Sequence, residues 1–337
     1  MKNFYRVILR EAWKTCRSHL FLWPLAFCAS FMGVAGSFQI FFDITDSNAP
    51  DTLTQWYGKT DFVTSVVLTW SQSLDRIPWG SLKVIDILPL AAFFLLLLLV
   101  ILLAIIIVSS QGGLMYALSQ LHDRKKTGYL TSFRQGLDHF WGIFGINLVY
   151  RLLYLFVIGL VITPIILTVF FTPGPFRLLL LALMYLVILP VFIVLDLVAR
   201  YSMFYLVLYN QRLKEALWNG WLLFVSSWVI SVETAVILFG IIIMGFFVVS
   251  FVVLPVLTLL FAMFAAMVAF SPSALNLFAV TAVTAFVALV ALVVVLFTTF
   301  QMSVWIGVFK RITTGEHQSK IHRLLRHLPS LHRHLMA

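Results

Sequence analysis

Long uninterrupted apolar runs are the feature of this sequence that most constrains its fold. Six such runs, each longer than 18 residues, lie at about 20–42, 88–110, 141–171, 178–199, 221–247 and 279–308. At about 1.5 Å per residue, a helical run of this length crosses the ~30 Å hydrocarbon core of a bilayer with its backbone groups hydrogen-bonded internally. The runs lack the alternation typical of barrel strands. The sequence therefore predicts an all-α integral membrane protein with six transmembrane helices.

Composition excludes a soluble globular protein. Of the 337 residues, 62% are apolar and 11% are charged, which leaves too little polar surface for a soluble chain of this size. The net charge of +10 would suggest a nucleic-acid partner in a soluble protein. In a membrane protein the same charge is typical of a surface that binds anionic lipid headgroups, so we expect lipid partners and no nucleic acid.

The basic residues set the predicted orientation. Of 23 Lys and Arg residues, 18 lie in the four segments 1–19, 111–140, 200–219 and 309–337. The segments 43–86 and 172–177 hold four, against six Asp residues. By the positive-inside rule the first group is cytoplasmic, so both termini are predicted to be cytoplasmic and the number of crossings to be even.

The expected domain organisation follows from this orientation. A cytoplasmic lead at 1–19 precedes a transmembrane domain at 20–308, which contains an outer polar segment at 43–87, and a basic cytoplasmic tail follows at 309–337. The sequence Gln111-Gly112-Gly113 is predicted to end the second span.

Amphipathic leads precede three of the apolar runs, at residues 3–18, 128–138 and 200–220. In the first lead, Phe4, Val7, Ile8 and Trp13 fall near one helical face, as expected of a helix lying in the headgroup layer. We predict that basic residues of the leads and tail contact anionic headgroups: Arg10, Lys14, Arg134, Arg212, Lys214, Arg323 and Arg326.

The apolar stretch 221–270 is long enough for two crossings. A seventh span would place the basic tail outside, against the charge distribution. We therefore predict one crossing at 221–247, followed by a membrane-embedded or re-entrant segment near Pro255; the seventh span is the alternative.

Three ionisable residues lie inside the predicted spans: Arg151, Asp196 and Glu233. Charges at this depth are costly unless paired or hydrated. Their depths favour a pair between Arg151 and Glu233, with Asp196 either joining it or pairing with Arg200 four residues later. This intramembrane polar site is either a structural ion pair that fixes helix register or part of a substrate or proton pathway.

The sequence contains no phosphate-binding loop, zinc-protease signature or serine elbow, so we expect no catalytic residues and no cofactor. Five histidines in the tail, at 317, 322, 327, 332 and 334, invite a metal site. Their spacing winds around a helix, so lipid binding is preferred and no metal is expected.

The first apolar run opens with Phe21-Leu22-Trp23-Pro24-Leu25-Ala26-Phe27. This opening, with the repeated order of lead, aromatic threshold and span, resembles a group of bacterial polytopic proteins that includes the membrane domain attached to some glycerophosphodiester phosphodiesterases, although Ala26 stands where Gly is typical. The resemblance implies an inner-membrane location and six helices. The His and Glu residues of the phosphodiesterase catalytic domain have no counterpart here, so it implies no hydrolase activity.

Three classes of function follow. The preferred class is a non-catalytic protein that organises lipid or a membrane-associated partner complex, supported by the basic leads and tail. The second is a transporter or permease with a polar intramembrane site. The third is a membrane-embedded enzyme of lipid or envelope metabolism. A protein partner or a second copy of the chain fits any of the three.

Overall fold

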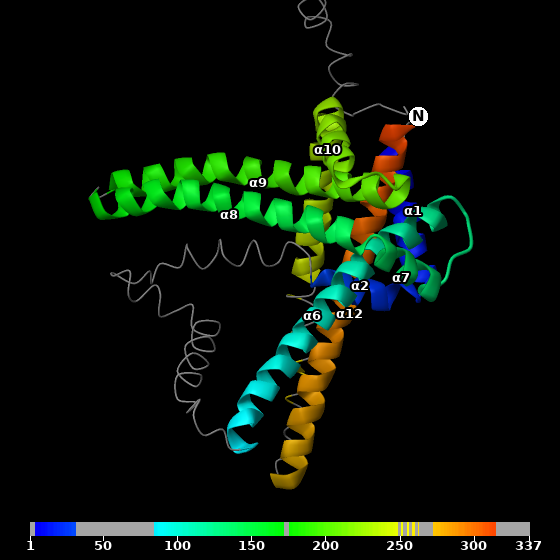
Figure 1. Ribbon diagram of the computed structural model, residues 1–337, viewed down its shortest axis with the longest axis vertical. Helices are drawn as coiled ribbons and strands as arrows, with labels where there is room; N and C mark the ends of the chain where they lie inside the picture. Colours follow the sequence, from blue (N-terminus) through cyan, green and yellow to red (C-terminus); the bar gives the residue numbers. More distant parts are fainter. Residues whose placement is uncertain are drawn as a thin grey trace, which may run out of the picture. The chain divides into compact units, whose positions relative to one another are not determined.

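The computed structural model describes residues 4–31, 84–171, 175–248 and 272–314, with a few positions between 251 and 262. Within these residues, every regular element is a helix (Figure 1). The helices, in chain order, are α1 (Phe4–Ser18), α2 (Leu22–Ser30), α6 (Val84–His122), α7 (Tyr129–Asp138), α8 (Phe140–Phe171), α9 (Pro175–Tyr209), α10 (Leu213–Val248) and α12 (Pro272–Thr313).

Five of the described helices are long and apolar enough to cross a membrane. The stretches concerned are Ala92–His122, Phe140–Leu160, Leu189–Tyr209, Leu213–Gly245 and Thr284–Thr313. They coincide with five of the six predicted spans, so the expectation of an all-helical protein with long apolar spans is confirmed for the described part of the chain.

The first predicted span, 20–42, is described only to residue 31 and contains α2, a helix of 9 residues. Leu22, Leu25 and Ala26 of α2 are buried, and α2 packs against α12. Most of the predicted outer segment 43–87, nearly all of the segment near Pro255, and the tail beyond residue 314 lie outside the described residues.

The helices extend further than the predicted spans. The helix does not stop at Gln111-Gly112-Gly113, where the second span was predicted to end, because α6 continues through these residues to His122. The third lead is likewise no separate surface helix. Its first part belongs to α9, its last part begins α10, and between them Asn210 has a left-handed backbone with φ of 52°.

The described residues fall into two compact units. In the smaller unit, residues 31–107, the described helix is the first part of α6, whose apolar side chains between Phe93 and Leu103 are exposed. The larger unit contains the other helices and the end of α6.

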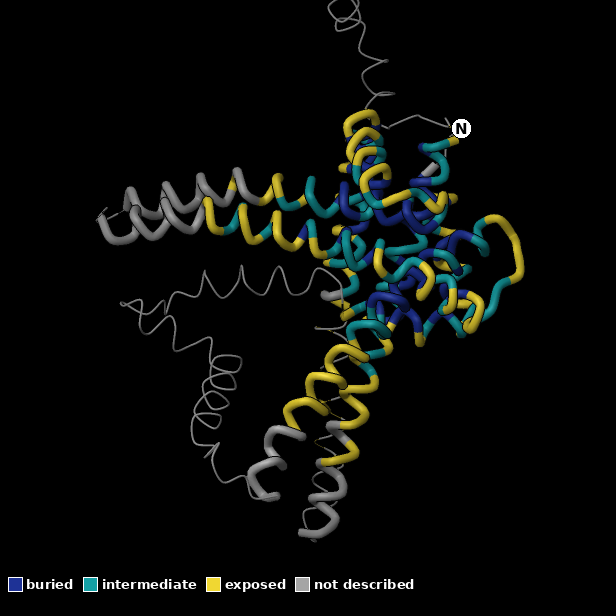
Figure 2. Tube along the Cα trace, viewed as in Figure 1, coloured by how far each residue is buried: buried dark blue, intermediate teal, exposed yellow. Residues whose placement is uncertain are grey.

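The core of the larger unit lies where the end of α6, the start of α8, the end of α9 and the end of α12 meet, as the dark blue residues of Figure 2 show. Its side chains include Leu114, Met115, Ile143, Ile146, Tyr201, Phe204, Val304 and Phe309. Away from this packed core, α8 and α9 still lie side by side, but apolar side chains such as Phe156 and Leu186 are exposed. Exposed apolar helix surface of this kind is suited to contact with lipid tails.

Glycines allow two close helix contacts in the core. A Cβ atom on Gly136 of α7 would collide with the carbonyl oxygen of Ser109 and lie 2.7 Å from the backbone nitrogen of Gly113, both on α6. A Cβ atom on Gly220 of α10 would lie 2.7 Å from the backbone nitrogen of Ser202 on α9. Small residues therefore hold α7 against α6, and α10 against α9, at backbone contact distance.

Candidate functional site

The three predicted intramembrane charges do not form one cluster. Arg151 is exposed on α8, and among the described residues no ion pair joins it to Glu233. Asp196 instead pairs with Arg200 on α9 at 2.8 Å, which confirms the local alternative. Arg200 also lies over the ring of Trp305 on α12, with its Cζ atom 5.7 Å from the ring centroid. The contact between Arg200 and Trp305 joins α9 to α12.

Glu233 on α10 is half-buried and accepts a hydrogen bond of 2.5 Å from the hydroxyl of Tyr5 on α1. Tyr201 on α9 and Ser231 on α10 also join their hydroxyls at 2.7 Å, two residues before Glu233. Polar contacts between helices therefore position this part of α10 on two sides.

Helix α1 packs along the last part of α12 and buries Tyr5, Ile8, Ala12 and Cys16. Of the face predicted to lie in the headgroup layer, Ile8 is buried in protein, whereas Val7 and Trp13 are exposed. The reason is that protein, in the form of α12, covers one side of the helix. The spacing of the four buried residues, three or four apart, places them on that one side.

Two contacts hold the second half of α1 on α12. The rings of Trp13 and Phe300 meet edge to face with their centroids 6.2 Å apart. The Cys16 thiol lies 3.5 Å from the carbonyl oxygen of Leu296, and burial raises its pKa above the ordinary value of a cysteine.

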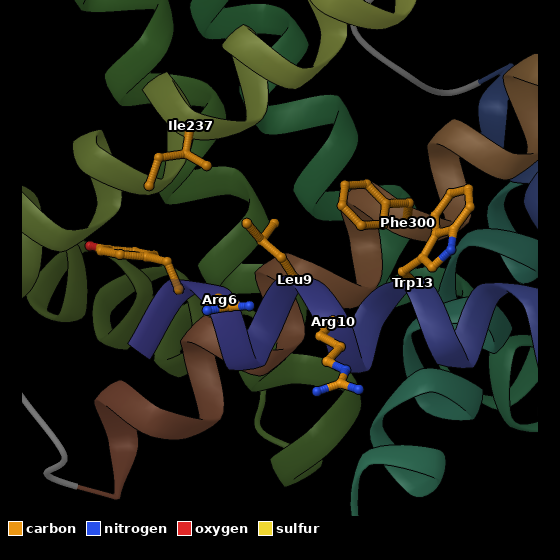
Figure 3. Close-up of a pocket in the computed structure, with 7 residues that line it drawn as sticks. Arg6, Leu9, Arg10, Trp13, Ile237 and Phe300 are labelled. Carbon is orange, nitrogen blue, oxygen red and sulfur yellow. The ribbon is translucent and has the colours of Figure 1, made fainter. Parts of the chain in front are cut away.

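An open groove of about 580 Å³ lies between α1, α10 and α12 (Figure 3). One stripe of α1 forms most of its lining, with one residue from each of the other two helices: Tyr5, Arg6, Leu9, Arg10, Trp13, Ile237 and Phe300. In Figure 3, Leu9 points to the side on which Ile237 lies, and Arg10 extends away from both. The groove therefore combines an apolar wall with two guanidinium groups.

The acidic residue of α1 faces α12, whereas two of its basic residues, Arg6 and Arg10, line the groove. Glu11 points to α12, where its carboxylate lies 3.8 Å from Arg311. Lys310, the preceding residue on α12, pairs with Asp123 at 2.7 Å. Among the described residues no ion pair involves Arg6 or Arg10. Among the described residues, the groove lining therefore holds two arginines and no acidic residue, while the carboxylate of Glu233 lies beside the groove on Tyr5.

The residues predicted to contact lipid headgroups are exposed wherever the structure describes them: Arg10 and Lys14 on α1, Arg134 on α7, Arg212, and Lys214 on α10. Arg323 and Arg326 lie outside the described residues. Of this set, only Arg10 lines the groove.

Sequence reasoning missed most of the groove. Arg6 and Arg10, four residues apart, share a helical face, and so do Tyr5, Leu9 and Trp13. This spacing was available from the sequence, but nothing in it indicated that Ile237 and Phe300 would lie opposite.

Among the described residues, no three His, Cys, Asp or Glu side chains come close enough to hold a metal ion. The tail histidines lie outside these residues. The site that the described chain offers is the groove beside α1. Comparison of the chain with known protein families, characterised proteins and solved structures finds no match.

Proposed function

We propose that this chain is a non-catalytic inner-membrane protein that crosses the bilayer six times, keeps both termini in the cytoplasm, and organises anionic lipid at the cytoplasmic leaflet. A partner complex assembled on that lipid surface is part of the same proposal. The observation that carries it is the exposed, basic side of α1, which remains after the other side has packed into the protein.

Four basic residues lie on the exposed part of α1: Arg6, Arg10, Lys14 and Arg17. Further exposed basic residues, Arg134 and Lys214, lie on α7 and at the start of α10, two other elements that contribute to the same unit. Each basic residue near an anionic membrane surface contributes about 1 kcal/mol to attraction, so such a set is sufficient to enrich anionic lipid.

Helix length supports this placement. At about 1.5 Å per residue, the 42 residues of α12 span about 63 Å, roughly twice the hydrocarbon thickness. Apolar side chains between Val280 and Val294 are exposed, whereas the end from Val304 to Phe309 is buried in protein. The exposed part is suited to lipid tails, and the packed end with its basic neighbours is suited to the headgroup layer and cytoplasm.

The alternatives gain less support. A transporter or permease needs polar groups along a common path, but Arg151, Asp196 and Glu233 have separate surroundings. A membrane-embedded enzyme needs a reactive group beside a substrate site, and the residues that line the groove are suited to binding lipid.

The test is the lipid composition around the protein when it is extracted together with native membrane in polymer nanodiscs. We expect phosphatidylglycerol and cardiolipin to be enriched over the bulk membrane, and the variant with Gln at positions 6, 10, 14 and 17 to lose most of the enrichment. A variant that exchanges Arg for Lys and Lys for Arg at these positions keeps the charge and should keep the enrichment. A wild-type lipid composition equal to that of the bulk membrane would contradict the proposal.

A further inference from the structure

We propose that the groove between α1, α10 and α12 binds one molecule of anionic phospholipid, whose phosphate is held by Arg6 and Arg10 and whose acyl chains lie on Leu9, Ile237 and Phe300. This inference rests on the proposed function, because it assigns a specific site within the surface that enriches anionic lipid.

The two arginines are placed to hold a phosphate. They are four residues apart on α1, so their Cα atoms are separated by about 6 Å along the helix axis. Both are exposed, and both line the groove. A guanidinium group presents a planar fork of N–H donors that binds phosphate oxygens in pairs. In Figure 3 the Arg10 side chain extends away from Leu9 and Ile237, so this exposed side chain has to rotate for both forks to hold one phosphodiester.

The local charge favours an anion. No acidic residue is among the seven described residues that line the groove. Glu11, the nearest acid in sequence, points to Arg311 on the α12 side. Glu233 accepts the hydroxyl hydrogen bond of Tyr5 and is not a lining residue. A phosphate in the groove therefore replaces water around two cations without displacing a protein carboxylate.

The apolar wall fits acyl chains. Phe300 is fixed by its edge contact with Trp13, and Ile237 lies on the opposite helix. Past Ile237, the same face of α10 continues with exposed Met244, seven residues later. An acyl chain that starts at Ile237 can follow this apolar surface without crossing polar side chains.

The size of the groove is suitable for part of a lipid. Its volume of about 580 Å³ lies within the range of about 300–1,000 Å³ that is typical of small-molecule sites. The groove is open, so it can receive the headgroup and the first part of the chains while their ends stay in the membrane. A soluble phosphate compound would use the arginines but leave the apolar wall exposed, so we favour a phospholipid over a soluble anion.

The experiment measures binding of phosphatidylglycerol to the full-length protein by native mass spectrometry, with phosphatidylcholine and inorganic phosphate as comparison ligands. We expect one saturable phosphatidylglycerol site that inorganic phosphate does not empty. Arg6→Gln with Arg10→Gln should weaken binding at least about tenfold. The control, Lys14→Gln with Arg17→Gln, removes the same charge from the same helix outside the groove and should weaken binding less than about threefold.

Alkylation of Cys16, which is buried where α1 packs on α12, shows whether α1 stays in place in each variant. The wild-type protein gives a second measurement, because bound lipid should shield Arg6 and Arg10, but not Arg17, from a guanidinium-specific reagent such as phenylglyoxal. If the double variant Arg6→Gln with Arg10→Gln detaches α1 from α12, its weaker binding cannot be assigned to the groove. The shielding in the wild-type protein then tests the site, and a lack of shielding at Arg6 and Arg10 overturns it.

The remaining outcomes separate this inference from the proposed function. Equal weakening by both double variants would overturn the groove site but leave a general basic surface that attracts lipid. Displacement of the lipid by inorganic phosphate would show a simple anion site and overturn the phospholipid assignment. Equal binding of phosphatidylglycerol and phosphatidylcholine, unaffected by either double variant, would overturn both.

Discussion

The hydroxyl of Tyr5 on α1 donates a hydrogen bond to the carboxylate of Glu233 on α10, 228 positions later in the chain. Tyr5 also lines the groove, so this contact fixes one end of it. The contacts between Trp13 and Phe300 and between Cys16 and Leu296 hold the other end of α1. The position of α1 is therefore set by two different helices.

Replacing Tyr5 by Phe should loosen the first turns of α1. A hydrogen bond to a charged group contributes about 1.5–3 kcal/mol, so we expect faster alkylation of Cys16 in a Cys28→Ser background and a lower unfolding temperature. Tyr129→Phe is the matched control, because Tyr129 is an exposed tyrosine on α7. Equal alkylation rates in both variants would show that the Tyr5 hydroxyl does not hold α1.

Burial should make Cys16 a slow nucleophile. Only the thiolate reacts, and the raised pKa of the buried thiol lowers the thiolate fraction at a given pH. In the Cys28→Ser protein, we expect the rate of iodoacetamide alkylation to rise at higher pH in the folded state than after denaturation in SDS. Coincident pH profiles would contradict this expectation.

The same raised pKa has a consequence for stability. The folded state keeps the Cys16 proton to higher pH than the unfolded state, so this contribution to the free energy of unfolding is complete below about pH 8.5 and is lost as pH rises through the folded-state pKa. We expect Cys16→Ala to reduce the loss of stability between pH 8 and pH 10, measured by thermal unfolding. A loss as large as that of the wild type would contradict this assignment.

Removing Asp196 alone should cost more stability than removing the whole ion pair. Arg200 has only 14% of its side chain exposed, so Asp196→Asn leaves a buried cation whose carboxylate partner is gone. Loss of one partner of a fully buried pair costs about 3–5 kcal/mol, and we expect a smaller cost here because 32% of the Asp196 side chain is exposed. Apolar replacement of both partners of a buried pair is often tolerated. We expect the double variant Asp196→Asn with Arg200→Met to resist SDS unfolding better than Asp196→Asn. The reverse order would show that the pair itself stabilises the fold.

Gly136→Ala should separate α7 from α6. The added methyl group would collide with backbone atoms of Ser109 and Gly113, which cannot rotate away, so we expect destabilisation of about 1–3 kcal/mol or more. Gly240→Ala is the control, because a Cβ atom there meets nothing within 4 Å and Ala favours a helix by about 1 kcal/mol. Thermal unfolding in detergent compares the two, and equal effects would contradict the close contact.

The sequence predicted those features that depend on neighbours along the chain. Apolar runs identified five long helices because helix formation in a membrane depends on local apolarity. The pair between Asp196 and Arg200 was among the alternatives because its partners are one helical turn apart.

Features that depend on packing between distant segments were not predicted. Depth along a helix suggested Arg151 as the partner of Glu233, but depth does not say which way a side chain points or which helix lies beside it. Arg151 is exposed on α8, and Glu233 meets Tyr5 from the other end of the chain. In the same way, Gly112 and Gly113 were predicted to end the second span, because their use as a contact surface depends on α7 and α8.

The contact between Cys16 and Leu296, 280 positions apart, has a consequence for the order of membrane assembly. Helix α1 is synthesised before α12, which carries Phe300 and Leu296, the residues that cover it. Until then Tyr5, Ile8 and Cys16 have no α12 to pack against. The groove is therefore completed only after α12 has inserted, and lipid bound in it would mark a chain in which α12 has already packed against α1.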